Sequence, residues 1–460
     1  WVPFSDINAQ CVPYGHQFAD PNVPTSVEDC LGYIDPNPIS KLDNAGHNYF
    51  LSQNPYTLNS YAMFGEAYYN VTDDLKLTAG LRWTDDQKHF VEIPSELLTR
   101  GYGYPITGAL DQQWKEWTGR FAANWTPKLD FTDQSMFYAS YAHGYKAGGA
   151  NPPPAVLTVY AGGGISNPTH PKTFEPEFND AFELGTKNTA LDGAVTLNGN
   201  VFFYNYKGYQ ISYIVDRTAV NLNFDATVKG AELQATWEPL PGLKFGFAGG
   251  YENTRIDNGQ KAIDLMDRVA GNPNWHLVKP FPGQASNCVL PNYLIAYELA
   301  HAASSLAFAC TEAYNLGVDP VTYTLSGPTP LPPGYPGFDP RAGNDPSDPY
   351  TGQNTYNGVD YGPAPNGGSG FSKNVSGNEL PNAPHYTASL TADYTVPLSP
   401  DWAATLHSDF YWQAQSWARV FNADMDKIEG YKTVNLALIL TDTSGWQAMA
   451  PGKGLGPLSA

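Results

Sequence analysis

YAMFGEAYYNVTDDLKLTAGLRW, residues Tyr61–Trp83, is the stretch of sequence that decides the fold. Its second half alternates strictly between apolar and polar residues, with Leu75, Leu77, Ala79, Leu81 and Trp83 in one set and Lys76, Thr78, Gly80 and Arg82 in the other. Successive side chains of a β-strand point to opposite faces, so this alternation predicts a strand with one apolar face. The turn residues VTDD precede it and predict a hairpin with Tyr61–Asn70.

The same pattern recurs further along the chain, and short Asp-, Pro- and Gly-rich turns join the predicted strands in pairs. These hairpins are Ala181–Thr189 with Val195–Tyr206, Lys229–Trp237 with Leu243–Tyr251, and Tyr386–Val396 with Trp402–Trp412. Long segments separate the hairpins, namely Thr84–Glu116, Ala147–Asn179 and most of Asn253–Ala383. Short turns that alternate with long loops are typical of outer-membrane β-barrels, which have short periplasmic turns and long extracellular loops.

The composition agrees with a large β-structure. Of 460 residues, 14% are aromatic and only 15% are charged, and there are 30 tyrosines, 44 glycines and 39 prolines. The net charge of −20 argues against a nucleic-acid partner, which needs a basic surface. No run of about 18 apolar residues occurs, which excludes a transmembrane helix, whereas a spanning strand needs only about 9–11 residues with one apolar face. We therefore predict an all-β fold, a large antiparallel transmembrane β-barrel with long extracellular loops.

A secreted β-rich enzyme or binding module would show the same alternation. In that case Leu75, Leu77, Leu81 and Trp83 would point into a packed interior, whereas in a barrel they would face lipid. The direction of these side chains therefore distinguishes the two classes.

Four cysteines form two well-separated pairs, Cys11 with Cys30 and Cys288 with Cys310. Each pair encloses a loop-like stretch, which predicts two local disulfides in an oxidising compartment. A metal site is the alternative, but neither pair has CxxC spacing and no histidine lies at a matching distance.

The predicted strands and loops divide the chain into five parts. Residues 1–60 are expected to be an extracellular loop region with a disulfide, 61–253 barrel hairpins, 254–383 a long elaborated extracellular loop region, 384–440 barrel strands and 441–460 an irregular tail. Within the long loop region, the apolar stretch Asn292–Cys310 could form a short helix.

No catalytic motif stands out, so we predict no enzyme activity, cofactor or metal. Lys146 lies in AHGYKAGG, which lacks the spacing of a phosphate-binding loop, and its glycines are expected to permit close strand approach or a bulge. The paired carboxylates Asp85/Asp86 and Glu175/Glu177 have no partner base and are expected to be solvated. His407 is expected to line the lumen of the barrel.

Four segments in succession resemble the barrel of TonB-dependent receptors. They contain GLRW before Thr84, GYKAGG from Gly144, ELGTK from Glu183 and KGAEL from Lys229 with its PLPGL turn. Each motif is weak by itself, but four in the same order are a strong signal. The resemblance covers most of Tyr61–Tyr251 and, more weakly, Pro384–Leu440.

The resemblance implies a barrel of about 22 strands around an N-terminal plug, energised through a TonB box. Nothing before Tyr61 resembles a plug, and nothing after Leu440 resembles the usual final strands, so we expect the sequence to be cut at both ends. The partners that the resemblance implies are outer-membrane lipid and lipopolysaccharide, a small-molecule ligand, and the TonB complex if a plug exists in the full-length protein.

The family implies import of a scarce ligand across the outer membrane of a Gram-negative bacterium. Siderophore receptors commonly use Tyr, Trp, Arg and Gln, so Arg82, Tyr102, Tyr104, Tyr145 and Lys146 are candidate ligand residues by position. A ferric siderophore is favoured over haem, because His143 precedes Gly-Tyr and not the haem-receptor block. Sugars or aromatic compounds are alternative ligands. A barrel with a structural or surface-interaction role in an assembly is an alternative function.

Overall fold

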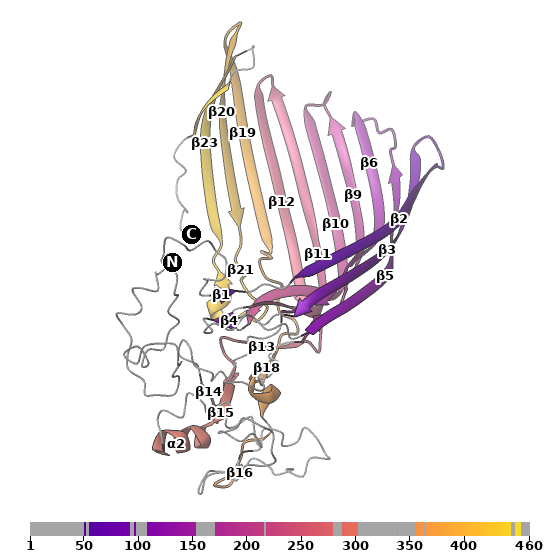
Figure 1. Ribbon diagram of the computed structural model, residues 1–460. Coiled ribbons are helices and arrows are strands. Elements are labelled where there is room, and N and C mark those ends of the chain that lie inside the picture. The colour runs from indigo at the N-terminus through magenta and orange to yellow at the C-terminus, as the bar shows by residue number, and fades with distance from the viewer. Residues whose placement is uncertain are drawn as a thin grey trace, which may run out of the picture.

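The computed structural model is built around one antiparallel sheet of 12 strands (Figure 1). The structure describes residues 50–51, 55–92, 96–97, 108–152, 171–215, 218–278, 288–301, 338, 355–362, 364–442 and 447–451. The strands follow one another in the sheet in chain order, β2-β3-β5-β6-β9-β10-β11-β12-β19-β20-β23-β24. Every neighbouring pair is antiparallel, as the predicted hairpins require.

The sheet strands are long, and the remaining elements are short. The sheet contains β2 (Tyr56–Asn70), β3 (Leu75–Glu92), β5 (Gly108–Trp125), β6 (Gln134–Lys146), β9 (Glu177–Ala190), β10 (Val195–Val215), β11 (Thr218–Leu240), β12 (Leu243–Ile256), β19 (Tyr386–Ser399), β20 (Trp402–Gln413), β23 (Tyr431–Asp442) and β24 (Gln447–Pro451). The others are β1 (Phe50–Leu51), β4 (Glu96–Leu97), β7 (Gly149–Ala150), β8 (Thr173–Phe174), β13 (Lys261–Ile263), β14 (Trp275–Val278), β15 (Cys288–Pro291), α2 (Asn292–His301), β16 (Thr355–Tyr356), β17 (Val359–Asp360), η5 (Pro365–Gly368), β18 (Ser372–Asn374), β21 (Ser416–Trp417), η6 (Asp424–Asp426) and β22 (Lys427–Ile428).

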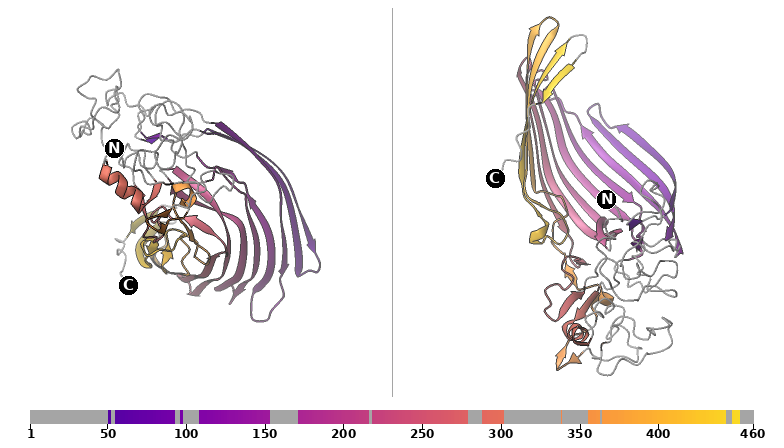
Figure 2. Two further views of the ribbon diagram at one scale, coloured as in Figure 1. Left: turned by 90° about the horizontal axis from the view of Figure 1, so that it is seen from below. Right: turned by 60° about the vertical axis from the view of Figure 1, so that its left-hand side comes forward.

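The sheet curves into an arc, with β2 at one edge and β24 at the other (Figure 2). The short turns lie along the upper rim in Figure 1, and the long connections with their small sheets lie at the lower end. We call these two ends of the sheet the short-turn end and the long-loop end. The connections at the short-turn end are short as predicted. Those at the long-loop end are long, except that only two residues separate β10 from β11.

The outer face of the arc is apolar. One row of directly paired residues runs across six strands as Ala67, Ala79, Phe121, Tyr141, Phe182 and Phe203. Its aromatic side chains are exposed, as are Leu81 and Trp117 on the same face. Leu75, Leu77 and Trp83 are only partly covered. Together with Leu81, these three side chains were expected to distinguish a membrane barrel from a secreted β-rich protein. None of the four is buried in a packed interior, as expected for a face that contacts lipid.

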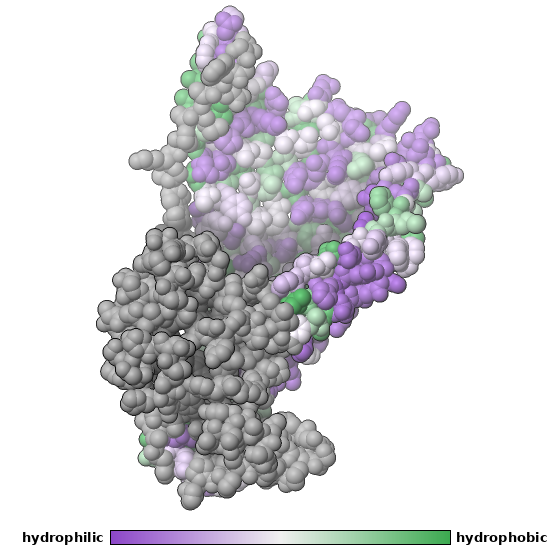
Figure 3. Space-filling view, viewed as in Figure 1, coloured by the Kyte–Doolittle hydropathy of each residue, from purple (hydrophilic) through white to green (hydrophobic). Residues whose placement is uncertain are grey.

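The inner face is polar. The row next to that apolar row runs through Glu66, Gly80 and Arg120. Hydrophilic side chains are spread over the hollow side of the sheet in Figure 3. The period of two that was read from Leu75–Trp83 therefore sets one polar and one apolar face across neighbouring strands.

Four sheet strands extend well beyond their predicted ends. The hairpin strands predicted to end at Tyr206 and to begin at Lys229 continue to Val215 and from Thr218, and β3 and β5 extend into a predicted loop. A loop was predicted for Thr84–Glu116, but β3 continues to Glu92 and β5 begins at Gly108, and the two extensions pair residue by residue. The prediction failed because TDDQK is polar on both faces, so the hydrophobic period disappears although the backbone pairing continues.

The two terminal parts of the chain also contain strands. β2 begins at Tyr56, inside the expected loop region 1–60, and β1 pairs with β4. The segment 441–460 was predicted to be an irregular tail, but Gln447–Pro451 forms β24 and pairs with β23. The QAMA stretch contains neither glycine nor proline, so it can complete a ladder before Pro451.

The described parts of the connections β12–β19 and β20–β23, together with the described residues of the distal β10–β11 hairpin between Tyr209 and Phe224, form a body that we call the loop cap. It contains two buried apolar clusters, one around Trp275 and Leu294 and the other around Phe224 and Ile256. Helix α2 confirms the predicted helix as far as His301, and the remainder to Cys310 lies outside the described residues. Within the described residues, no helix is both long and apolar enough to span a membrane.

Cys288 is the one cysteine among the described residues, and it is buried and disulfide-bonded. Cys11, Cys30 and Cys310 lie outside the described residues. The two predicted pairings therefore stay predictions.

Candidate ligand site on the inner face of the sheet

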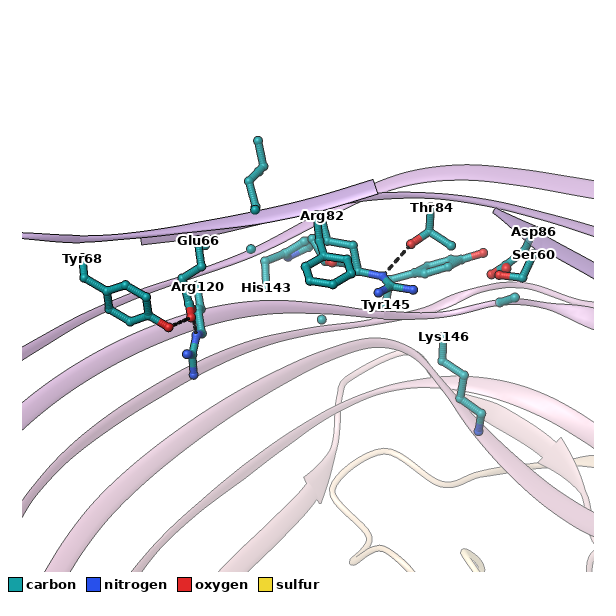
Figure 4. Close-up of a pocket in the computed structure, with 18 residues that line it drawn as sticks. Ser60, Glu66, Tyr68, Arg82, Thr84, Asp86, Arg120, His143, Tyr145 and Lys146 are labelled. Carbon is teal, nitrogen blue, oxygen red and sulfur yellow. Dashed lines mark hydrogen bonds and ion pairs between the residues drawn. The ribbon is translucent and has the colours of Figure 1, made fainter. Parts of the chain in front are cut away.

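A recess of about 960 Å³ lies on the inner face of β2, β3, β5 and β6. Three of the five candidate ligand residues, Arg82, Tyr145 and Lys146, line it together (Figure 4). The other two, Tyr102 and Tyr104, lie outside the described residues. The recess therefore brings together every candidate that the structure describes.

Arg82 reaches the recess because it belongs to the polar set of β3. Its Nε–H donates to the hydroxyl of Thr84 at 3.0 Å, two residues along the same face. Its guanidinium carbon lies 5.9 Å from the centre of the Phe64 ring on β2, within the range of a cation–π contact. Both contacts orient the guanidinium without neutralising its charge.

Lys146 is the last residue of β6, at the long-loop end of the recess. Its Nζ lies 4.0 Å from Glu177 of β9, and its side chain is 62% exposed. The glycines after it permit close approach, as predicted, since a Cβ at Gly148 would collide with the carbonyl oxygen of Phe174. The carbonyl of Gly148 accepts a hydrogen bond of 2.5 Å from Lys88 Nζ.

Tyr145 directly precedes Lys146 in the chain and lines the same recess. Its ring packs 5.7 Å from that of Phe178. Its hydroxyl is shielded from solvent and points toward Asp86 of β3 (Figure 4). The tyrosine therefore presents a polar group on a ring held by an aromatic neighbour.

The sequence did not single out Glu66 and Arg120, although both line the recess. Arg120 Nε donates to Glu66 Oε1 at 2.6 Å, and the Tyr68 hydroxyl donates to the other oxygen of the same carboxylate. The pair spans β3 at Gly80, where a Cβ would lie only 3.1 Å from Glu66 Oε1. The alternation in the sequence indicates the face on which Glu66, Tyr68 and Arg120 lie. The contact between Glu66 and Arg120 is found only once the register of the strands is known.

The paired carboxylates are less solvated than predicted. Asp85 is only 8% exposed and accepts a hydrogen bond of 2.7 Å from Gln113. Glu177 accepts one of 2.8 Å from the backbone N–H of Gln210 and has a mostly covered side chain. The prediction was wrong for these two because the neighbouring strands β5 and β10 extend far enough to cover them.

His407 lies in the row of the inner face that runs through Lys244 and Asp393, so it lines the hollow side as predicted. Its Nδ1 is 2.6 Å from Asp393 and its Nε2 is 3.7 Å from Asp409. Among the residues that the structure describes, no group of three or more His, Cys, Asp or Glu side chains could hold a metal ion.

The loop cap contains a second, buried charge network. Asp264 is 1% exposed, and its two oxygens lie 2.7 Å from Arg419 Nη1 and 2.9 Å from Lys373 Nζ. Burial opposes ionisation of Asp264, but hydrogen bonds from Arg419 and Lys373 outweigh it and hold the pKa of the carboxyl below its ordinary value. Arg419 also donates to buried Asp426 at 2.6 Å, so this network holds three segments of the cap together.

A search of curated proteins gives no match. Among solved structures, the ferric yersiniabactin uptake receptor FyuA from Yersinia pestis is 15% identical with a TM-score of 0.49, over 86% of this chain and 40% of that one. The siderophore receptor PiuA from Acinetobacter baumannii is 13% identical with a TM-score of 0.44, over 87% of this chain and 42% of that one. This chain thus spans about two fifths of the length of these receptors.

A family model described as the TonB dependent receptor-like β-barrel matches residues 14–281, more than half of the chain. The match includes all four segments that carried the resemblance in the sequence. It also includes β2 to β12, the strands that form the recess and the apolar outer row. The chain belongs to the TonB-dependent receptor family, as part of its β-barrel.

Proposed function

We propose that this chain forms part of the wall of a receptor in the outer membrane of a Gram-negative bacterium, and that the receptor imports a ferric siderophore. The observation that carries the proposal is the recess on the inner face that Arg82, Tyr145 and Lys146 line, with Lys146 at its long-loop end. Tyrosine and cationic side chains are the types with which such receptors hold a chelated metal. The ligand would enter from the outside, where the long loops lie in such barrels.

The partners follow from the two faces of the sheet. The apolar outer row would contact membrane lipid, and its long-loop end would contact lipopolysaccharide. Uptake would draw its energy from the TonB complex, which acts on a plug inside the barrel. The proposal includes no chemical step in the chain itself.

The experiment uses the full-length gene in a host that lacks its own siderophore receptors. Uptake of radioactive iron is measured with a panel of ferric siderophores, in a strain with TonB and in a matched strain without it. We expect accumulation of at least one chelate in the first strain only. No accumulation with any chelate would contradict the proposal. Uptake of labelled oligosaccharides or aromatic compounds instead would show that the ligand belongs to one of those classes.

A second function, surface interaction within an assembly, is supported by the size of the loop cap. Its two apolar clusters give it a folded interior of its own, which a simple entry loop does not need. The TonB comparison separates the two functions, because a surface component would reach normal abundance in both strains and accumulate iron in neither.

A further inference from the structure

We infer that the ligand of this recess is an anion, whose negatively charged oxygens are held between Arg82 and Lys146. The inference rests on the proposed function and narrows its ligand class. Among ferric chelates, the inference favours those that carry a net negative charge on catecholate or carboxylate oxygens. Chelates without net charge are disfavoured.

The charge of the recess differs from that of the whole chain. The net charge is −20, yet the recess is lined by the cations Arg82, Arg120 and Lys146 and by only two carboxylates, Glu66 and Asp86. Glu66 is already occupied, since it accepts hydrogen bonds from Arg120 and Tyr68. Arg82 and Lys146 therefore remain as the two cations available to a ligand.

Neither of these two cations is neutralised by a close carboxylate. Arg82 uses its Nε–H for Thr84, and it forms no ion pair within the described residues. Lys146 lies at the limit of an ion pair with Glu177, whose carboxylate also accepts a hydrogen bond from the backbone N–H of Gln210. Lys88, whose ammonium donates to the Gly148 carbonyl, interacts electrostatically with Asp86 and so offsets the second carboxylate of the recess.

The rest of the inner face shows that such a concentration of cations is not general. Further round the arc, β9, β11 and β12 present Glu183, Glu232 and Glu252 on the same face. Glu183 is bound by Tyr138 and, at 3.0 Å, by Asn200. Lys187 and Lys244 also lie on this part of the inner face, so cations and carboxylates are mixed there. The β3–β6 side is the more favourable one for an anionic ligand.

The geometry suits a planar anion with more than one oxygen. A guanidinium offers parallel N–H donors to such groups, and Arg82 retains its two Nη groups for this purpose. An ammonium adds a compact charge with rotatable donors.

The test compares two probes on the full-length receptor in outer-membrane preparations. One is a ferric tris-catecholate, which is a trianion, and the other is the ferric complex of a cyclic tris-hydroxamate, which is uncharged. We expect tighter binding of the trianion, with an affinity that decreases as salt is added. Stronger binding of the uncharged chelate would overturn this inference while sustaining the proposed function, and failure to bind or import any ferric chelate would count against both.

Variants locate the effect at the two cations. Arg82→Ala and Lys146→Ala should each lower the affinity for the trianion by about tenfold or more, since a hydrogen bond to a charged group is lost. Both should leave binding of the uncharged chelate unchanged, and Arg82→Lys should restore part of the loss. Lys128→Ala removes an exposed cation at the short-turn end and serves as the matched control.

Heat-modifiable migration confirms that each variant is folded before binding is measured. Folded Arg82→Ala and Lys146→Ala proteins that bind the trianion as tightly as the unmodified receptor would overturn the inference. An equal loss for both chelates would also overturn it, because it would indicate altered shape and not charge recognition.

Discussion

Asp264 and Arg419 are 155 positions apart in the chain, and their side chains meet at 2.7 Å in the loop cap. Asp264 belongs to the β12–β19 connection and Arg419 to the β20–β23 connection. Lys373 contacts the second oxygen of Asp264, and Asp426 contacts Arg419 Nε. One buried carboxylate therefore adds an ionic contact between two long connections. The same connections also meet through hydrogen bonds, such as that from Asn378 to the Val420 carbonyl, and through packing of Val420 in the cluster around Ile256.

Substitution Asp264→Asn should loosen this junction, because it leaves Arg419 and Lys373 without a carboxylate partner in a covered site. Removing one member of a buried ion pair costs about 3–5 kcal/mol, and partial exposure of both cations places the expected cost near the lower value. Hydrogen exchange of the full-length protein in detergent should show lower protection over residues 417–426. Asp401→Asn, in the exposed β19–β20 turn, should leave that protection unchanged. Equal protection in both variants would contradict the role of Asp264.

The same junction predicts how the loop cap responds to acid. Its hydrogen bonds hold the pKa of Asp264 below the ordinary value of 3.8 despite burial. A carboxyl with a lowered folded-state pKa stabilises the fold above its unfolded-state pKa, and this contribution is lost as the pH falls through the folded-state pKa. The cap should therefore stay closed from neutral pH down to that ordinary value and loosen only below it.

Hydrogen exchange corrected for the intrinsic rate at each pH measures this loosening. In Asp264→Asn the acid-dependent step should shrink, because the titrating group is gone. A loosening centred at mildly acidic pH in the unmodified protein would show that another group controls the cap.

The sequence predicted the two faces of the sheet because alternation is a local signal. Leu81 and Arg82 are neighbours, and their opposite directions follow from the period of a strand. The same rule placed Arg82 on the recess side, but it could not predict the contact between Glu66 and Arg120, which depends on the register across Gly80. The junction at Asp264 has no local pattern at all, since its partners lie in loops that are distant in sequence.

Two glycines of the family segments should be sensitive to an added methyl group. Gly185 of ELGTK lies against the Tyr138 ring, and Gly230 of KGAEL lies against the Phe202 ring. A Cβ at Gly230 would stand 2.6 Å from Phe202 and would also collide with the carbonyl oxygen of Tyr251. Gly230→Ala should therefore destabilise the sheet by about 1–3 kcal/mol, as overpacking commonly does.

Urea unfolding of the protein in detergent measures that loss. Gly65→Ala is the matched control, because a Cβ there meets nothing within 4 Å. If the midpoints of both variants equal that of the unmodified protein, the close packing at Gly230 is not a constraint on the fold.

Leu390 and Ser389 are adjacent residues of β19 on opposite faces, and they test which face of the sheet contacts lipid. Leu390 is 49% exposed and pairs with Phe247 and Phe410 on the outer face, whereas Ser389 pairs with Ala248 and Tyr411 on the inner face. Arginine at a lipid-facing position near the bilayer midplane costs about 2–4 kcal/mol, and arginine facing a polar lumen costs much less. Leu390→Arg should therefore lower the free energy of unfolding in phospholipid vesicles by roughly that amount, and Ser389→Arg should not. Tryptophan fluorescence during urea unfolding gives both values, and a larger loss for Ser389→Arg would reverse the assignment of the two faces.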